Sequence, residues 1–341
     1  MTDLIARIEG RAGRLTLNRP QALNALTHAQ CLATEAALIA WRDDPAVALV
    51  ILDGAGDRAF CAGGDIAQVW AAGRDGDFAM GRDFWRDEYR MNLMLATYPK
   101  PIISFMQGFV MGGGVGYGCH VAHRVVGEST QMAMPECGIG LIPDVGGTWL
   151  LGRAPGKLGL YLALTAARIG PGDAIAAGFA DAFLPEDDWP GVIARLCATG
   201  DPGAIPAHDA PVSPLAVQSA LIDRLFSGAD IPAILAALDD DMTPLATAAR
   251  KAMRRNSPLS MASTQALLSP APRSLTEALR HEFRWTWRAV QKGDFLEGVR
   301  AQIIDKDRNP RWRHASAADV TPAEVAAMLA PLGADDWKGN A

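Results

Sequence analysis

The sequence predicts an α/β fold with a helical C-terminal region. Two continuous apolar runs, VALVILDG at 47–54 and PIISFMQGFV at 101–110, have the length and composition of strands that are buried on both faces. Strand, glycine-rich turn and helical pattern alternate through this half of the chain, which is typical of α/β proteins. Beyond about residue 184 only helical patterns remain.

The first 40 residues predict a β-hairpin followed by a helix. In LIARIEGRAGRLTLNRP, apolar side chains alternate at Ala6 and Ile8 and again at Leu15 and Leu17, as expected for two strands that each bury one face. The helix is predicted over THAQCLATEAALIAWRDD. Thr27 at its start is a favourable N-cap, because its hydroxyl can accept a backbone N–H.

A segment rich in Pro, Gly and Ala divides the chain further on. ATGDPGAIPAHDAPVSP, at 198–214, has the composition of a connector. It separates a predicted core of residues 1–197 from a predicted helical region of residues 215–341. That region contains helical patterns at 215–228, 230–240, 243–256, 274–293 and 321–332.

The composition excludes several classes of function. Lys and Arg are scattered and the formal charge of the 341 residues is −6, so no nucleic-acid partner is expected. No run of about 18 apolar residues predicts a membrane span, and the start MTDLIARIEG lacks the pattern of a signal peptide. The cysteines form no C-x-x-C pair, so we expect reduced thiols in a cytoplasmic protein and no soft-metal site. They are Cys31, Cys61, Cys119, Cys137 and Cys197.

Two glycine-rich turns stand between a strand and a helix. They are DRAFCAGGDIAQVW at 57–70 and GFVMGGGVGYGCHVAH at 108–123. Backbone N–H groups at a helix start lack partners and carry the positive end of the helix dipole, and glycines let another group approach them closely. Two such turns that converge would form a two-amide oxyanion hole. The alternative for each turn alone is tight packing.

Nucleotide-binding glycine motifs do not explain these turns. The spacing G-x-G-x-x-G is absent from residues 112–118, and GRAPGKLG at 152–159 has no Ser or Thr after Lys157. The sequence therefore favours neither a dinucleotide site nor a P-loop.

Two acidic residues follow in apolar surroundings. Glu136 and Asp144 lie in MAMPECGIGLIPDVGGTWLL, where a charged side chain is unfavourable and is expected only if it has a function. Burial raises the proton affinity of a carboxylate, which suits an acid, a base or a nucleophile. The alternative is that both side chains only cap turns.

These motifs resemble a known family. AFCAGGDI, MGGGVGYG, MPECGIGLIPDVGGTWLLGR and LTAARIGPGDAIAAGFAD resemble the crotonase (enoyl-CoA hydratase/isomerase) superfamily over at least residues 5–185. PDVGG, NSPLSM and DFLEGVRAQIIDKDRNPRW at 294–312 resemble 3-hydroxyisobutyryl-CoA hydrolases and extend the match to nearly the whole chain. The resemblance implies a crotonase-like ββα spiral core.

The resemblance also implies roles for five residues. The backbone N–H groups of Gly64 and Gly113 would hold the thioester oxygen, which would explain the glycines. Glu136 would be the main catalytic carboxylate, as nucleophile or as general base. Asp144 would lie near the substrate hydroxyl, and Glu88 in FWRDEYRMN would line the substrate pocket. The alternative for Glu88 is a solvated helix residue.

One position departs from the wider superfamily. Hydratases have a glutamate two residues after the triple glycine, and this chain has Gly116 there. Addition of water to a double bond needs two carboxylates around one water, so the departure argues against hydration. Isomerisation with a single acid at Glu136 remains an alternative, whereas Asp144 and the C-terminal motif favour hydrolysis.

The expected function is hydrolysis of a 3-hydroxyacyl-CoA thioester, above all 3-hydroxyisobutyryl-CoA, in valine breakdown. An enoyl-CoA isomerase or hydratase and a non-catalytic acyl-CoA-binding protein are the alternatives. We expect no metal or other cofactor, since coenzyme A is part of the substrate; His120 and His123 lack a third ligand. Arg19 and Arg58 are candidates for the CoA phosphates, with a solubilising surface role as the alternative. A homo-oligomer remains an option.

Overall fold

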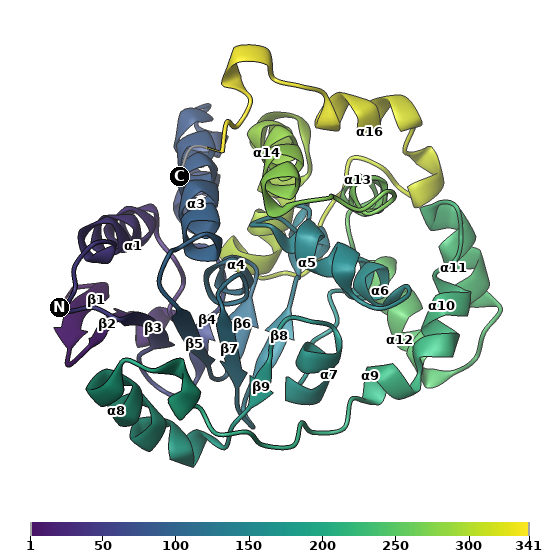
Figure 1. The fold of residues 1–341 in the computed structure, drawn as a ribbon. Helices are drawn as coiled ribbons and strands as arrows, with labels where there is room; N and C mark the ends of the chain where they lie inside the picture. The colour runs from purple at the N-terminus through teal and green to yellow at the C-terminus, as the bar shows by residue number, and fades with distance from the viewer. Residues whose placement is uncertain (1, 340–341) are drawn as a thin grey trace.

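The computed structural model describes residues 2–339, and within this range all the strands precede residue 184 (Figure 1). The terminal residues 1 and 340–341, which the predicted core and helical region include, lie outside the described residues. The larger sheet has the strand order β1-β2-β3-β5-β7-β9. Its strands are β1 Leu4–Glu9, β2 Ala12–Leu17, β3 Leu49–Gly54, β5 Ile102–Met106, β7 His123–Val126 and β9 Ala182–Phe183. The smaller sheet has the order β4-β6-β8, with strands β4 Ala59–Cys61, β6 Phe109–Met111 and β8 Gln131–Ala133.

The predicted hairpin and first helix are confirmed. β1 and β2 pair antiparallel from Leu4 opposite Leu17 to Glu9 opposite Ala12. Helix α1, His28–Trp41, begins with a capping box. The Gln30 N–H donates to the Thr27 hydroxyl (3.2 Å), and the Thr27 N–H donates to the Gln30 side chain (2.9 Å).

The prediction of one strand at 101–110 is wrong, because two strands of different sheets occupy this segment. The chain turns at Gly108, whose φ is +57°, and a Cβ there would lie 2.2 Å from the carbonyl oxygen of Arg58. The Gln107 side chain stabilises the turn by donating to the carbonyl oxygens of Gly54 (2.8 Å) and Gly56 (2.9 Å). An apolar pattern alone does not reveal where a buried strand changes sheets.

The same transfer between sheets occurs three times and produces the ββα spiral. β3 is followed by β4, β5 by β6, and β7 by β8, with the first of each pair in the larger sheet and the second in the smaller sheet. β4, β6 and β8 pair in parallel, so the turns that follow them meet at one edge of the smaller sheet. The two glycine turns and the turn with Glu136 are therefore neighbours in space.

The helices up to Thr199 are interspersed with the strands. They are α1, α2 Ala67–Arg74, α3 Ala79–Ala96, α4 Gly113–Gly118, α5 Gly147–Arg153, α6 Leu158–Thr165, α7 Pro171–Ala176 and α8 Trp189–Thr199. They do not alternate strictly with the strands, because α2 and α3 follow each other directly, as do α5, α6 and α7. Apolar side chains of α8 cover one face of the larger sheet and form a small separate core with it.

The C-terminal region is helical, as predicted, and each of the five helical patterns contains a helix. These helices are α9 Pro214–Val217, α10 Ser219–Leu225, α11 Ile231–Asp239, α12 Pro244–Met253, α14 Leu275–Lys292 and α16 Pro322–Leu329. The patterns did not include α13, Pro258–Leu267, or α15, Phe295–Val299. The latter continues into a π-helical turn at Arg300–Ile304.

The C-terminal helices curve around the upper and right sides of the strands in Figure 1, in green to yellow. α14 packs against α3 and α5, and one apolar core contains side chains from Leu15 in β2 to Trp337 near the C-terminus. The limits of the core, connector and helical region remain predictions. Within the described range, no helix has the length and apolar character needed to span a bilayer.

Candidate active site

The five residues that the resemblance singles out line one cavity. Its volume is about 160 Å³. Gly64 and Gly113 come from the turns after β4 and β6, Glu136 and Asp144 from the segment after β8, and Glu88 from α3. The other walls are mostly apolar and include Ile66, Phe84, Trp85, Ile139, Leu141 and Ile303.

The two glycine turns are in direct contact. A Cβ on Gly113 would lie 3.1 Å from the backbone nitrogen of Gly64 and 2.8 Å from Oε1 of Glu88. Gly112 has a φ of +49°, and a Cβ on it would lie 2.6 Å from Oε1 of Glu136. Neither the Gly64 nor the Gly113 N–H has a hydrogen-bond acceptor among the described residues. The glycines therefore keep the space beside two unpaired amides open.

Glu136 lies three residues after the end of β8, directly after Pro135, at the start of a short 3₁₀ helix, Glu136–Ile139. Its side chain is buried, and its Oε2 has no hydrogen-bond partner among the described residues. Burial, reinforced by the charge of Asp144, raises the pKa of Glu136 well above its usual value. A carboxylate kept away from both water and cations becomes a stronger base when it is ionised.

Asp144 is presented by a tight turn in which Val145 (φ +54°) and Gly146 (φ +79°) have left-handed conformations. The hydroxyl of Tyr89 in α3 donates to Oδ2 of Asp144 (2.7 Å). Burial raises the pKa of Asp144 to about 7, although the Tyr89 hydrogen bond acts in the opposite direction. This carboxyl group can therefore gain or lose a proton near neutral pH.

Glu88 is a buried residue of α3 and not a solvated one, since it is only 3% exposed. Its Oε1, which faces Gly113, has no hydrogen-bond partner among the described residues. Burial and the nearby charge of Asp144 raise the pKa of Glu88 well above its usual value. The solvated alternative for this position is thus wrong.

The position of Gly116 has a physical explanation. A Cβ on this residue would lie 2.6 Å from Cβ of Val145 and 3.0 Å from Nδ2 of Asn92. The turn that presents Asp144 fills the space that a glutamate side chain would need. The cavity therefore lacks the second carboxylate on α4 that hydration requires.

Tyr89 and Ile303 are two of the residues at the site that were not among the sequence predictions. Tyr89 follows Glu88 directly and is fully buried against Asp144, and a helical projection of α3 would have placed it on the apolar face. Ile303 reaches the cavity from the π-helical turn after α15. The signal for Ile303 is its place in the C-terminal motif IIDKD.

The histidine and arginine candidates lie outside the cavity lining. Nε2 of His120 is 2.8 Å from the carbonyl oxygen of Val145, and burial lowers the pKa of His120 to about 4. The guanidinium of Arg19 donates to Asp65 (2.9 Å) and to the carbonyl oxygen of Ala25 (2.7 Å), whereas Arg58 is exposed. Among residues 2–339, no group of three or more His, Cys, Asp or Glu is arranged to hold a metal ion.

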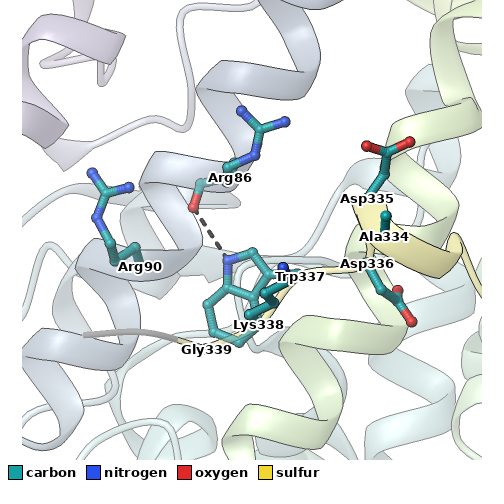
Figure 2. A pocket seen from close by; sticks show the side chains of 8 residues that line it. All are labelled: Arg86, Arg90, Ala334, Asp335, Asp336, Trp337, Lys338 and Gly339. Carbon is teal, nitrogen blue, oxygen red and sulfur yellow. Dashed lines mark hydrogen bonds between the residues drawn. The ribbon is translucent and has the colours of Figure 1, made fainter.

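A larger cavity of about 390 Å³ lies where the last described residues cross α3 (Figure 2). The indole N–H of Trp337 donates to the carbonyl oxygen of Arg86 (3.3 Å). Arg90 also lines this cavity, but its guanidinium donates to Glu35 and Asp87. Arg86 pairs in the same way with Asp83. Both cationic groups of α3 at this place therefore have carboxylate partners, and we assign no ligand to the cavity.

The buried acids and unpaired amides define the chemistry of the small cavity. Two N–H donors can stabilise negative charge on a carbonyl oxygen, and a basic carboxylate beside them can activate water or attack directly. The apolar walls exclude bulk water and strengthen both interactions. This arrangement suits acyl chemistry on a small substrate group.

Comparison with known proteins agrees with this arrangement. The chain is 37% identical to the 3-hydroxyisobutyryl-CoA hydrolase, mitochondrial, of Gallus gallus, covering 98% of this chain and 91% of the relative. It is 38% identical to 3-hydroxyisobutyryl-CoA hydrolase 1 of Arabidopsis thaliana, covering 91% and 87%.

Solved structures of similar proteins carry other names. A crystal structure of an enoyl-CoA hydratase from Rhodobacter sphaeroides 2.4.1 has 57% identity and a TM-score of 0.97, covering 99% of this chain and 100% of the other. A carnitinyl-CoA dehydratase from Mycobacterium thermoresistibile has 44% identity and a TM-score of 0.93, covering 97% of both chains. The sequence profile of the enoyl-CoA hydratase/isomerase family matches residues 12–329. The chain therefore belongs to the enoyl-CoA hydratase/isomerase family.

Proposed function

We propose that this protein hydrolyses the thioester of a 3-hydroxyacyl-CoA, with 3-hydroxyisobutyryl-CoA as the substrate, to the free hydroxy acid and CoA. The observation that carries the proposal is the pair of unpaired amides, Gly64 and Gly113, beside the buried carboxyl group of Glu136 in one cavity. The names of relatives at 37% and 38% identity over more than nine tenths of the chain support the substrate.

In the proposed mechanism the thioester oxygen accepts hydrogen bonds from Gly64 and Gly113. Glu136 then takes a proton from water, and the resulting hydroxide attacks the carbonyl carbon. Alternatively, the Glu136 carboxylate itself attacks and forms an anhydride that water later opens. In both routes negative charge builds on the thioester oxygen, the C–S bond breaks, and the CoA thiolate leaves and takes up a proton.

Asp144 and Glu88 complete the substrate site in this proposal. Asp144 would orient the 3-hydroxyl group or supply a proton, for which a pKa of about 7 is well suited. Glu88 would line the pocket and, in its protonated form, could donate a hydrogen bond to a substrate oxygen. All chemical groups required come from the chain and the substrate, so we propose that no metal or redox cofactor takes part.

Double-bond hydration or isomerisation is the second candidate, because the solved structure at 57% identity is named an enoyl-CoA hydratase. The close packing of Val145 and Asn92 around Gly116 argues against hydration, since it leaves no room for a carboxylate there. Isomerisation needs only one acid and would use Glu136.

An assay of thiol release over a panel of acyl-CoA esters distinguishes these functions. We expect free thiol from 3-hydroxyisobutyryl-CoA, and no hydration of crotonyl-CoA or isomerisation of a 3-enoyl-CoA. Hydration or isomerisation without thiol release would contradict the proposal. Binding without any turnover would make the protein an acyl-CoA carrier.

Location and assembly are further proposals. The cysteines at 31, 61, 119, 137 and 197 are all free and buried, which supports a reducing compartment, and we propose a cytoplasmic location. The Gallus gallus relative is named mitochondrial. On the basis of the same family resemblance we also propose a role in valine breakdown, with a homo-oligomer as one option for its assembly.

A further inference from the structure

We infer that Glu282, in the C-terminal helix α14, is a positioning residue that holds Asp144 in the active cavity. The inference rests on the proposed function and adds a residue 138 positions away in the sequence to the active site (282 minus 144). Glu282 does not line the cavity and acts through the backbone of the turn that presents Asp144.

The Glu282 carboxylate makes three hydrogen bonds to this turn. The Gly146 N–H donates to Oε2 (2.7 Å), while the Thr148 N–H (2.9 Å) and the Thr148 hydroxyl (2.5 Å) donate to Oε1. The side chain of Glu282 is completely buried, so water does not compete for these bonds. Each of the two carboxylate oxygens accepts hydrogen bonds from a different residue, Oε2 from Gly146 and Oε1 from Thr148.

The turn needs such support because its conformation is unfavourable. Val145 is β-branched and has a φ of +54°, which L residues of this type rarely adopt. A strained backbone of this kind persists only where surrounding contacts determine it. Glu282 holds the turn from α14, and Nε2 of His120 lies 2.8 Å from the Val145 carbonyl oxygen.

The hydrogen bonds of Glu282 to Gly146 and Thr148, which we call the clamp, act on a turn that also carries a reacting group. Asp144 lies two residues before Gly146, the first residue that Glu282 holds, and its carboxylate accepts the Tyr89 hydroxyl (2.7 Å). The backbone of the turn and the side chain of Tyr89 together orient this carboxylate in the cavity. A small movement of the turn would separate Asp144 from Tyr89 and from a bound substrate.

Burying a carboxylate is energetically unfavourable, so a carboxylate is not expected where the contact is purely structural. Burial raises the pKa of Glu282 to about 8, although the hydrogen bonds from Thr148 and Gly146 act in the opposite direction. A glutamine would fit the same space, but it has only one acceptor oxygen, and its amide would oppose one of the N–H donors.

The test is the variant Glu282→Gln, with Glu277→Gln as the matched control on the same helix. Glu277 is half-buried in the first turn of α14 and accepts the Arg273 N–H. We expect Glu282→Gln to lower kcat of thiol release about 10–100-fold, as misplacement of a reacting group does, with KM changed less than about threefold. Glu277→Gln should leave both constants unchanged.

Coupling to Asp144 separates positioning from a general loss of structure. In an Asp144→Asn background, Glu282→Gln should reduce kcat by less than about threefold, since residues that act as a unit are not additive. An equal loss in both backgrounds, or kcat within about twofold of wild type for the single variant, would overturn the inference. Should Glu282→Gln fail to fold, Thr148→Val removes one of the three bonds and must show the same coupling, with a smaller loss of kcat.

A crystal structure of the folded variant gives a readout that does not depend on turnover. In Glu282→Gln, or in Thr148→Val if the former does not fold, we expect a displaced turn and a broken Tyr89–Asp144 hydrogen bond. An unchanged turn with that bond intact would overturn the inference. If the wild type releases no thiol from any ester of the panel, the proposed function is wrong, and this structural result still decides whether Glu282 positions Asp144.

Discussion

The strand-bearing part of the chain, through Phe183, and the helices from Pro214 onward contribute to the candidate active site in different ways. The former carries the amides of Gly64 and Gly113 and the carboxyl group of Glu136 on turns that follow neighbouring parallel strands. The latter contributes Ile303 to the cavity wall and Glu282 to the clamp behind Asp144.

This difference shows which part of a fold brings reacting groups together. Parallel strands end at the same edge of a sheet, so short motifs on successive turns meet without any long-range information. Helices packed around the strands instead enclose these groups and hold them in position. They do so through single side chains whose local sequence does not distinguish them from other residues of a helix. Substitutions in the two parts should therefore separate groups that react from groups that position them.

Replacing the main carboxylate should have the largest effect. Glu136→Gln keeps size and polarity but cannot accept a proton or attack, so we expect kcat for thiol release to fall about 10²–10⁴-fold. Binding of the CoA ester, measured by calorimetry, should stay within about threefold. Near-normal turnover in this variant would contradict the role of Glu136.

Closing the space beside the amides should have the next largest effect. In Gly113→Ala the new Cβ would lie 2.8 Å from Oε1 of Glu88 and 3.1 Å from the Gly64 nitrogen. We expect kcat/KM to fall about 10²–10³-fold, the cost of losing one oxyanion donor. Gly170→Ala is the control, because nothing lies within 4 Å of its Cβ. Equal kinetics in the two variants would argue against an oxyanion site at Gly113.

The contribution of the helical region to binding should be smaller. Ile303 and Ile304 are equally exposed, at 38% and 37%, but only Ile303 lines the cavity. Ile303→Ala should raise KM about fivefold with kcat nearly constant, since a partly buried isoleucine contact contributes about 1 kcal/mol. Ile304→Ala should leave KM unchanged. The same KM for both variants would remove Ile303 from the substrate site.

The smallest predicted effect concerns stability. The folded-state pKa of Asp144, about 7, lies above its unfolded value, so the stability from this group is complete below pH 4 and is lost as the pH rises through 7. Asp144→Asn should therefore raise Tm by about 2–4 °C at pH 8, and the rise should shrink steadily as the pH falls towards 4.

Asp241 in the helical region provides the opposite case. Hydrogen bonds from Thr243 and Arg224 lower the pKa of Asp241 to about 2, so its stabilisation is present above pH 4 and is lost as the pH falls through 2. Asp241→Asn should not raise Tm at pH 8. A similar rise in Tm for both variants would show that burial of Asp144 is not the cause.

Much of the strand-bearing part was predictable from its sequence, because its signals are local. The hairpin, the Thr27 cap and the two glycine turns each follow from a few neighbouring residues. Glu136 and Asp144 attract attention because acids are rare in an apolar, Pro- and Gly-bounded segment. The transfer between sheets at Gly108 was missed, since a buried strand that changes sheets keeps the same apolar pattern.

The supporting residues were harder to predict because their partners are distant in the sequence. Glu282 lies between Arg280 and Arg284 and resembles a charged surface residue of α14. Its helical spacing to Ala278 and Ala289 places it on the buried face, but nothing local indicates that Gly146 and Thr148 satisfy its carboxylate. Only the packing of α14 on α5 provides that information.

The proposed mechanism depends most on the position of the thioester oxygen. A crystal structure of the Glu136→Gln variant with 3-hydroxyisobutyryl-CoA should place that oxygen about 2.7–3.1 Å from the backbone nitrogens of both Gly64 and Gly113, with the hydroxyl group near Asp144. An oxygen that is bound by neither amide, or an acyl group outside this cavity, would contradict the account.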